Sequence, residues 1–243
     1  MPQLLYMHQS HWRLQLHWGR QLVWGRQLLW RRQSVLRRQL VVMARWPAAG
    51  RCKSRLARGL GRQRAAEIQR RLTDHTLASC RQWRGRQGAD AKRQLVLAVD
   101  GLAPRAARRW GEGLGVDRCL SQGGGGLGSR LQRQLQRAWR EGARQVVLIG
   151  SDLPTLALSD LELAFAGLNS APLVLGAAAD GGYWLIGLSR PTANLFCGIP
   201  WGSDQVLATT LKAAERLDLA PLLLDVRSDL DRPADLLPWR RSP

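Results

Sequence analysis

Three cationic side chains at alternating positions follow a glycine turn and suit the binding of phosphate groups. The stretch "PAAGRCKSRL" holds Arg51, Lys53 and Arg55, with no acidic residue nearby. In an extended loop their charged groups could converge on a di- or triphosphate, assisted by backbone N–H groups. The G-x-x-x-x-G-K-S/T spacing of a Walker A loop is absent. A solvated basic surface remains the alternative interpretation.

An aspartate stands where an apolar run of strand length stops. In "QVVLIGSDLPTL", Asp152 follows the run and Pro154 ends any further strand pairing. A carboxylate at this point is well placed to hold Mg²⁺ or Mn²⁺ that bridges nucleotide phosphates. Aspartate is also common in caps and turns, so a plain turn is the alternative.

Two adjacent glycines follow another aspartate in "DGGYWLIGL". Gly181 and Gly182 would let a backbone approach a ligand closely, or they would form a hairpin turn together with Asp180. From these residues alone, the hairpin is the favoured interpretation.

Two further motifs lie near the end of the chain. In "IPWGSDQV", Ser203 or Asp204 could cap a helix and Trp201 could belong to the core. In "SDLDRPADL", Asp229 and Asp231 are either turn formers or a second source of metal ligands. The four histidines lie mostly in the first part of the chain, so neither histidine catalysis nor a histidine metal cluster is expected.

These motifs depend on strands that alternate with helices. Apolar runs at 40–44, 93–101 and 145–150 predict buried strands, and helical spacing over 61–83 predicts a helix between the first two. A helix capped by Ser159 is expected after the third. The alternation predicts an α/β fold with a mainly parallel sheet covered by helices on both faces.

The candidate residues fall at the ends of the predicted strands. Asp100 ends the second strand, and Asp152 and Asp180 follow later ones, while the basic loop and a run of four glycines occupy equivalent positions. Ligands of parallel sheets bind at the carboxyl ends of the strands. The sequence therefore predicts an active site at that edge.

Composition narrows the class of protein. The formal net charge is +19, but 34 of the 37 cationic residues are arginine, which a GC-rich genome would also produce. The first 145 residues are basic and the rest is acidic, which suits an anionic ligand meeting a carboxylate-bound metal. Four scattered cysteines indicate free thiols in a reducing cytoplasm. The longest apolar runs are strand-sized, far below the roughly 18–20 residues of a membrane span.

Residues 11–40 repeat in steps of six, with a tryptophan at positions 12, 18, 24 and 30. These aromatic rings, interleaved with arginines, could stack on single-stranded nucleic acid. A poorly ordered extension, or translation from a start codon placed too early, is the favoured interpretation. We therefore predict an extension over 1–38, a catalytic domain over 39–237 and a tail over 238–243.

Six motifs in this order resemble a known family. They are "VVMARWPAAGRCKSRLARGLG", "QGGGGLGSRL", "VVLIGSDLPTL", "LGAAADGGYWLIGL", "LFCGIPWGSDQVLATTL" and "DLDRPADL". They look like the bacterial GT-A-type proteins of arsenosugar biosynthesis, described as glycosyltransferases. That family is similar to nucleotidyltransferases such as 2-phospho-L-lactate guanylyltransferase. The resemblance covers about residues 39–237.

The resemblance implies a Rossmann-like three-layer GT-A fold that binds a nucleotide-diphospho-sugar and Mg²⁺ or Mn²⁺. It implies a basic phosphate-binding loop, a metal site, an acceptor-side turn and a segment that closes the pocket. The phosphate-binding loop would comprise Arg51, Lys53, Ser54 and Arg55, and the metal site Asp152 and Asp231. The acceptor-side turn would comprise Asp180, Gly181, Gly182 and Tyr183. The segment that closes the pocket would comprise Trp201, Ser203 and Asp204.

The chain departs from the family pattern in three places. Arg232 replaces a usual threonine, which weakens the assignment of Asp231 to the metal. The run of four glycines lacks the acidic residues common there, so any catalytic role of those acids is missing. The repeat extension has no counterpart in the family.

The expected function is transfer of a glycosyl group from a nucleotide sugar to a small-molecule acceptor, with Asp180 or Asp204 activating the acceptor hydroxyl. The nearest alternative is a nucleotidyltransferase that attacks the α-phosphate of a nucleoside triphosphate and releases pyrophosphate. Two other classes stay open. One is a nucleic-acid-binding protein that uses the Trp/Arg repeat, and the other is a regulatory domain without turnover.

Overall fold

A computed structural model describes residues 36–86 and 91–236 of the chain. The predicted extension over 1–38, apart from its last three residues, and the predicted tail over 238–243 lie outside the described residues. The described part begins with strand β1 at Leu36. No helix within it is long and apolar enough to span a membrane.

Seven strands of the described residues form one sheet in the order β3-β2-β1-β4-β6-β5-β7. Their bounds are β1 Leu36–Arg45, β2 Ala91–Asp100, β3 Arg118–Ser121, β4 Gln145–Gly150, β5 Leu173–Ala178, β6 Tyr183–Leu188 and β7 Pro221–Arg227. Strand β6 runs antiparallel to β4 and β5, whereas the other pairs are parallel. The expected mainly parallel α/β sheet is confirmed.

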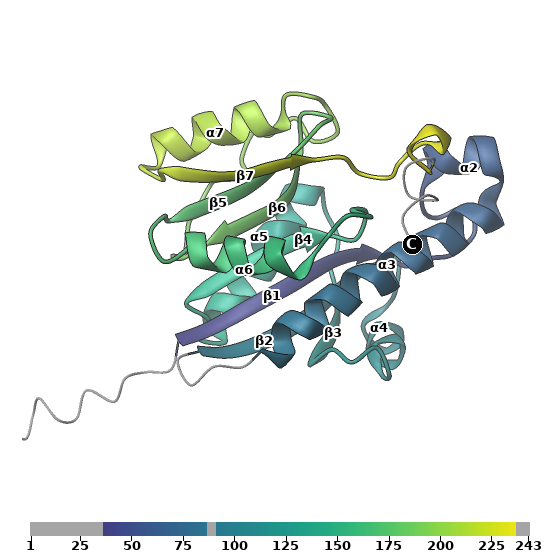
Figure 1. Cartoon of the computed structure of the whole chain (residues 1–243), viewed down its shortest axis with the longest axis horizontal. Coiled ribbons are helices and arrows are strands. Elements are labelled where there is room, and N and C mark those ends of the chain that lie inside the picture. Colours follow the sequence, from purple (N-terminus) through teal and green to yellow (C-terminus); the bar gives the residue numbers. More distant parts are fainter. Residues whose placement is uncertain (1–35, 87–90, 237–243) are drawn as a thin grey trace, which may run out of the picture. The chain divides into compact units, whose positions relative to one another are not determined.

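Helices cover both faces of this sheet, as Figure 1 shows for α3 and α6 in front of it and α5 behind it. Their bounds are α2 Ser54–Leu60, α3 Arg62–Gly85, α4 Pro104–Gly111, α5 Leu127–Arg140, α6 Leu158–Gly167 and α7 Val206–Arg216, followed by a short 3₁₀ helix, η1, at Pro233–Asp235. Alternate strand residues face opposite layers. In β1, Leu40 and Val42 pack on the α3 side, while Val41 packs on the α5 side.

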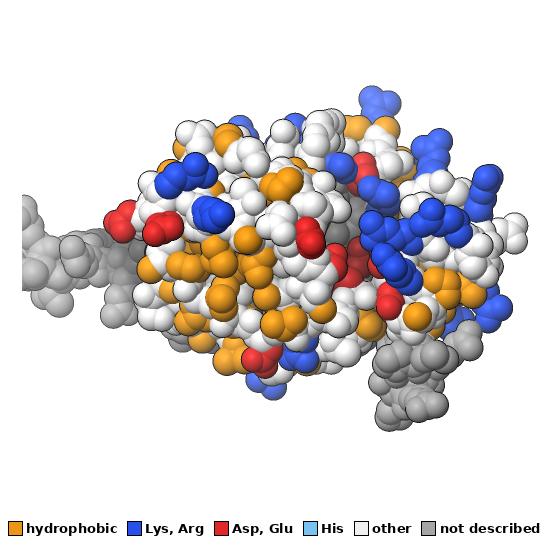
Figure 2. All heavy atoms as spheres, turned by 90° about the horizontal axis from the view of Figure 1, so that it is seen from above, with side chains coloured by type: hydrophobic (Ala, Val, Ile, Leu, Met, Phe, Trp, Pro, Cys, Tyr) orange, Lys and Arg blue, Asp and Glu red, His pale blue; other side chains and the backbone are white. Residues whose placement is uncertain are grey.

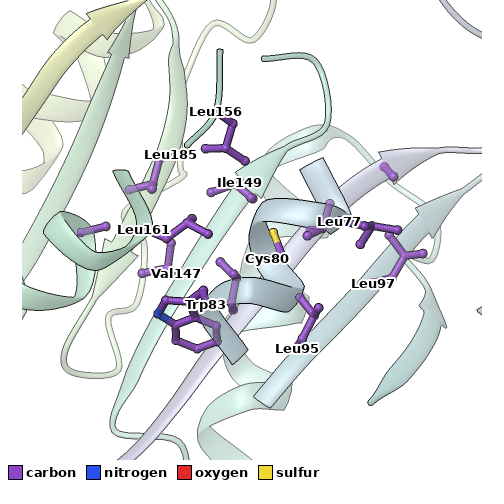
Figure 3. Packing of buried hydrophobic residues seen from close by; sticks show 14 of the residues in the cluster. Leu77, Cys80, Trp83, Leu95, Leu97, Val147, Ile149, Leu156, Leu161 and Leu185 are labelled. Atoms are coloured by element: carbon purple, nitrogen blue, oxygen red, sulfur yellow. The ribbon is translucent and has the colours of Figure 1, made fainter. Parts of the chain in front are cut away.

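The larger core lies between the sheet and the layer of α3, α4 and α6. Figure 3 shows Leu77, Cys80 and Trp83 of α3 pointing toward the sheet. The Trp83 ring is fully buried and stacks on Phe165 of α6 with a centroid distance of 4.6 Å. This packing explains why the helical spacing over 61–83 was a reliable indicator of α3.

Two elements were not expected from the sequence. The first is helix α2, which begins at Ser54 directly after Lys53, so that the basic stretch is not an extended loop. The other is β3, whose four residues, "RCLS", are too few for a recognisable pattern. The prediction of Ser159 as a helix cap is wrong: Ala157 holds the cap position of α6, and the Asp160 carboxylate accepts a hydrogen bond from its backbone N–H.

A small third cluster fastens α2 to the end of the described chain. Leu56 of α2, Leu72 of α3 and Leu230 after β7 are completely buried against one another. This cluster brings the segment after β7 next to the start of α2, although about 170 residues separate them. Consequently, acidic residues near 230 meet the basic residues near 53.

Candidate functional site

The carboxyl end of every parallel strand and the amino end of β6 meet at one edge of the sheet, where a pocket of about 600 Å³ opens. Figure 2 shows acidic side chains at a hollow beside a group of lysine and arginine side chains. Arg51, Gly181 and Asp204 of the predicted set lie outside the pocket lining. The predicted residues that line it are Lys53, Ser54, Arg55, Asp152, Asp180, Gly182, Tyr183, Trp201, Ser203 and Asp231.

Lys53 is the buried cation of this pocket. Its side chain is only 3% exposed, and its backbone adopts the left-handed conformation with φ of 48°. That turn directs Nζ inward, where it donates to the Leu230 carbonyl at 2.6 Å and lies 2.9 Å from Asp152 Oδ1. A buried ammonium requires such partners to offset its lost hydration. Lys53 therefore links the basic stretch, the end of β4 and the segment after β7.

A second ion pair lies beside the first. The Arg55 guanidinium, on the first turn of α2, donates to Asp231 Oδ2 at 2.8 Å, and Asp231 Oδ1 is 4.0 Å from Lys53 Nζ. Because Arg51 is exposed outside the pocket, the predicted convergence of three cationic groups does not occur. Instead, two of the predicted phosphate-binding cations neutralise the two predicted metal ligands.

Asp229 is the most perturbed carboxylate of the site. Burial, and then the negative charges of Asp152 and Asp180, raise the pKa of Asp229 to about 6, whereas the Lys53 charge opposes this shift. From the sequence, Asp229 is only a possible turn former or metal ligand. Burial is the larger cause of its raised pKa, and the carboxylates that other strand ends bring to the same pocket add to it.

A charged pair that was not expected from the sequence lies on the other side of the pocket. Arg130, on the first turn of α5, is 2.9 Å from Asp100 Oδ2 and its side chain is 19% exposed. Gln122 is buried, accepts from Arg130 at 3.3 Å and donates to the carbonyls of Ala44 and Ala98. Two features of the sequence could have revealed this pair. They are a cation one helical turn after a glycine loop and an aspartate at the end of a predicted strand.

The turn between β5 and β6 brings the acceptor-side residues of the prediction to the pocket rim. The Asp180 Oδ1 atom accepts a hydrogen bond from the Gly182 backbone N–H at 3.0 Å. Gly181 has φ of +88°, and an added Cβ would lie 2.1 Å from the Asp204 carbonyl oxygen. The glycines therefore form the favoured hairpin turn, and Gly181 allows the backbone of residue 204 to pack closely against it. Close approach to a ligand stays a prediction.

Replacing Gly181 by Ala is expected to lower the free energy of unfolding by about 2 kcal/mol, because the new methyl group meets backbone atoms at a positive φ. Gly182→Ala is the matched control. Its Cβ would meet only the Asp180 carboxylate oxygen, at 3.2 Å, so a change below about 1 kcal/mol is expected. Urea unfolding of both variants measures the difference. Equal losses would show that the packing against residue 204 is unimportant.

Trp201 and Ser203 lie in the loop before α7. The Trp201 ring makes an edge contact with Tyr183 at a centroid distance of 6.2 Å, and both rings line the pocket. The Ser203 hydroxyl accepts from the Gln205 backbone N–H at 3.2 Å, so it stabilises the turn that enters α7. The cap position of α7 is Gln205, and the expectation that Ser203 or Asp204 occupies it is wrong.

The carboxylates of the pocket fit a divalent cation that is shared with a substrate. Asp152 Oδ1 is buried and accepts no aligned hydrogen bond from the described residues, although Lys53 Nζ is near. The described residues contain no group of three acidic, histidine or cysteine side chains able to enclose a metal. Mg²⁺ is often held by one or two carboxylates together with substrate phosphates. Asp152 and Asp231 are the residues that would hold it.

Comparison with known proteins agrees with this architecture. A protein-family model described as an uncharacterized protein conserved in bacteria, DUF2064, matches residues 84–203. A provisionally named nucleotide-diphospho-sugar transferase from Desulfovibrio desulfuricans G20 is similar in structure, with a TM-score of 0.69 and 28% identity over 82% of this chain and 84% of its own. Comparison with curated protein sequences gives no match.

More distant structures share the fold. Rv0371c from Mycobacterium tuberculosis in complex with manganese has a TM-score of 0.51 and 20% identity, covering 86% of this chain and all of its own. The inositol-1-phosphate CTP transferase from T. maritima has a TM-score of 0.51 and 16% identity, covering 84% and 92%. The expected Rossmann-like fold of nucleotide-diphospho-sugar transferases is thus confirmed. The D. desulfuricans and T. maritima structures carry the names of a nucleotide-diphospho-sugar transferase and of a CTP transferase.

Proposed function

We propose that the chain is a metal-dependent glycosyltransferase that moves a sugar from a nucleotide sugar to a small-molecule acceptor. The observation that carries the proposal is the set of paired charges in the carboxyl-edge pocket. Lys53 faces Asp152, Arg55 faces Asp231, and Arg130 faces Asp100. A diphosphate and a divalent cation can replace these partners, since each of these six charged groups already has an opposite charge nearby.

The cations of the pocket would hold the nucleotide part of the donor. Arg55 is half-exposed and its planar guanidinium suits a phosphate, so it can exchange Asp231 for the donor's diphosphate. The Ser54 hydroxyl lines the pocket beside it. Lys53 is fixed by the Leu230 carbonyl and contributes a stationary positive charge close to the same phosphates. Arg51 has no such position and is the weakest of the predicted ligands.

A divalent ion on Asp152 and Asp231, when bound, would stabilise the negative charge of the departing nucleoside diphosphate. The chain's own charges act in the same direction. Lys53 and Arg55 lie where that negative charge develops, and fixed charges in a partly closed pocket are effective because they need no reorganisation. Manganese in the similar structure from M. tuberculosis supports a metal, but does not distinguish Mn²⁺ from Mg²⁺.

Two carboxylates of the pocket are candidates for accepting the proton of the acceptor hydroxyl. Asp180 lines the pocket and is exposed, whereas Asp204 lies outside the lining and keeps its role only as an untested prediction. Asp229 also lines the pocket, and its raised pKa of about 6 is close to the value that suits a general base. We assign the role to Asp229 or Asp180.

A nucleotidyltransferase remains the second candidate. The same fold occurs in the CTP transferase from T. maritima. Transfer of a nucleotidyl group also requires positive charges around phosphates, which the pocket of this chain supplies. The two reactions differ in the bond that breaks: the sugar–phosphate bond in glycosyl transfer, and the bond between the α- and β-phosphates in nucleotidyl transfer. The structure with 28% identity favours the first candidate. The arsenosugar acceptor implied by the sequence resemblance stays a prediction.

Thermal unfolding with a panel of nucleotide sugars and nucleoside triphosphates, each with and without Mn²⁺, tests the proposal. We expect at least one nucleotide sugar to stabilise the protein only when metal is present, by about 2.7 kcal/mol at a hundredfold excess over Kd. Incubation with the same donors should release a nucleoside diphosphate. Release of pyrophosphate from a triphosphate, with no response to any nucleotide sugar, would identify a nucleotidyltransferase instead.

A further inference from the structure

A second pocket, of about 420 Å³, lies at the opposite edge of the sheet, where β1, β2 and β3 begin. Helix α5 ends at Arg140, and the Glu141 that follows it lines this pocket. We call this pocket the amino-edge niche. Its lining side chains on the α5 face come from Arg37, Gln39, Lys92, Gln94, Arg118 and Glu141.

The floor of the niche is built from amides. Gln39 and Gln94 are register partners on adjacent strands and therefore lie side by side on one face. Gln39 is only 3% exposed, yet its Oε1 atom has no hydrogen-bond partner among the described residues. Its Nε2 atom is 3.5 Å from Glu141 Oε2. A buried acceptor without a donor is unfavourable, and a ligand hydroxyl would satisfy it.

The rim of the niche is cationic. Arg37 and Lys92 form the next register pair on the same face, two residues closer to the amino edge, and both are exposed. Lys92 has no side-chain partner in the described part of the chain. Arg118 pairs with Glu141, whose backbone carbonyl also accepts from Arg37 at 3.0 Å. The rim therefore carries three positive charges and one neighbouring carboxylate.

The surroundings do not cancel this positive charge. Asp117, which also lines the pocket, is already paired with Arg84 at 2.9 Å and accepts from the Leu95 backbone N–H. Burial, together with the charge of Arg118, lowers the pKa of Arg137 on the last turn of α5. Repulsion among these cations would be relieved by a bound anion.

We propose that the amino-edge niche is a second ligand site, which takes a small phosphorylated polyol of the sugar-phosphate class. The phosphate lies among Arg37, Lys92 and Arg118, and a hydroxyl donates to Gln39 Oε1. The volume of the niche is within the range of small-molecule sites, about 300–1,000 Å³. The site does not depend on the proposed glycosyl transfer, because it lies at the other end of the strands.

Isothermal titration calorimetry of the full chain with glucose 6-phosphate, glucose and inorganic phosphate tests this site. We expect glucose 6-phosphate to bind most tightly. Lys92→Glu is expected to weaken it by about tenfold or more, since a charge-assisted contact becomes repulsive. Arg144→Glu is the matched control, because Arg144 is exposed, lies near the same edge outside the niche and undergoes the same change of charge. A loss below about twofold is expected there.

Gln39→Leu separates the amide floor from the cationic rim. The substitution keeps the size of the side chain and removes the unpartnered oxygen, so the protein should fold with unchanged or higher melting temperature. Its affinity for glucose 6-phosphate should fall to that for inorganic phosphate.

Several results would overturn the proposal. They are equal losses in Lys92→Glu and Arg144→Glu, unchanged binding in Gln39→Leu, or no heat from glucose 6-phosphate at millimolar concentration. Binding of a thymidine oligonucleotide is a further control. If that binding depends steeply on salt and both charge reversals weaken it equally, the niche is part of an extended surface for polyanions instead.

Discussion

Replacing Asp152 by Asn is expected to reduce turnover of the nucleotide sugar by about 10²–10³-fold and to abolish the metal-dependent part of nucleotide binding. Asp152, two residues after β4, offers a buried oxygen that accepts no aligned hydrogen bond from the described part of the chain, and this oxygen is the strongest candidate for a metal ligand in the pocket. An amide at the same place is a much weaker ligand for Mg²⁺ or Mn²⁺. The measurement is the thermal shift produced by nucleotide with and without metal, together with release of the nucleoside diphosphate.

The same substitution removes an ionic partner of the buried Lys53 side chain. Lys53 keeps its hydrogen bond to the Leu230 carbonyl, and Asp152 is 45% exposed, so the expected loss of stability is only about 1 kcal/mol. Asp74→Asn is the matched control, because Asp74 also belongs to an ion pair but lies on the exposed side of α3. If the metal-dependent shift survives in Asp152→Asn, the metal lies elsewhere. An equal loss of turnover in Asp74→Asn would indicate a general effect of the lost charge.

Replacing Asp229 by Asn is expected to raise the free energy of unfolding by about 2–3 kcal/mol at pH 7.5, and to change it little at pH 4. The pKa of Asp229 is raised from 3.8 to about 6 in the folded chain. Between these values the folded state binds the proton more tightly than the unfolded state. The native protein therefore loses stability as the pH rises from about 4 to 6, and a neutral amide at this position avoids that loss.

This gain of stability should accompany a loss of activity of about tenfold or more, since a carboxylate held in an unfavourable place is characteristic of functional sites. Asp225→Asn, on the exposed part of β7, is the control, and neither quantity should change there. Urea unfolding at the two pH values gives the stability difference. A gain that is the same at pH 4 and pH 7.5 would show that the charge of Asp229 is not its cause. A fully active Asp229→Asn would exclude it as the general base.

The main features of the fold could be predicted because they depend on local patterns. Short apolar runs predict β1, β2 and β4, since a strand buried on both faces must be apolar throughout. The spacing of apolar residues predicts α3. Strand β3 escaped prediction because four residues are too short for any periodicity. Ser159 has the residue type of a helix cap. The cap residue is instead Ala157, whose backbone N–H donates to the carboxylate of Asp160.

For the site, the sequence predicts only the edge of the sheet at which it lies and some of the residues that line it. The rule that parallel strands end at one edge places Asp100, Asp152 and Asp180 together, and all three line the pocket. Alternating charges in the basic stretch suggested three convergent groups, but Ser54 starts a helix and only two of the three side chains reach the pocket. Leu56 of that helix packs against Leu230, which is distant along the chain.

The sequence by itself determined the order of elements and the edge at which the chemistry occurs, because hydrophobic periodicity and chain direction are local properties. Only the tertiary structure decided which charges meet. Lys53 pairs with Asp152 and lies near Asp231 across about 100 and 180 residues of chain. The pKa of Asp229 is raised first by its burial and then by the carboxylates of two other strand ends. Burial and opposite charge act through distance in space, so no pattern along the chain could have predicted them.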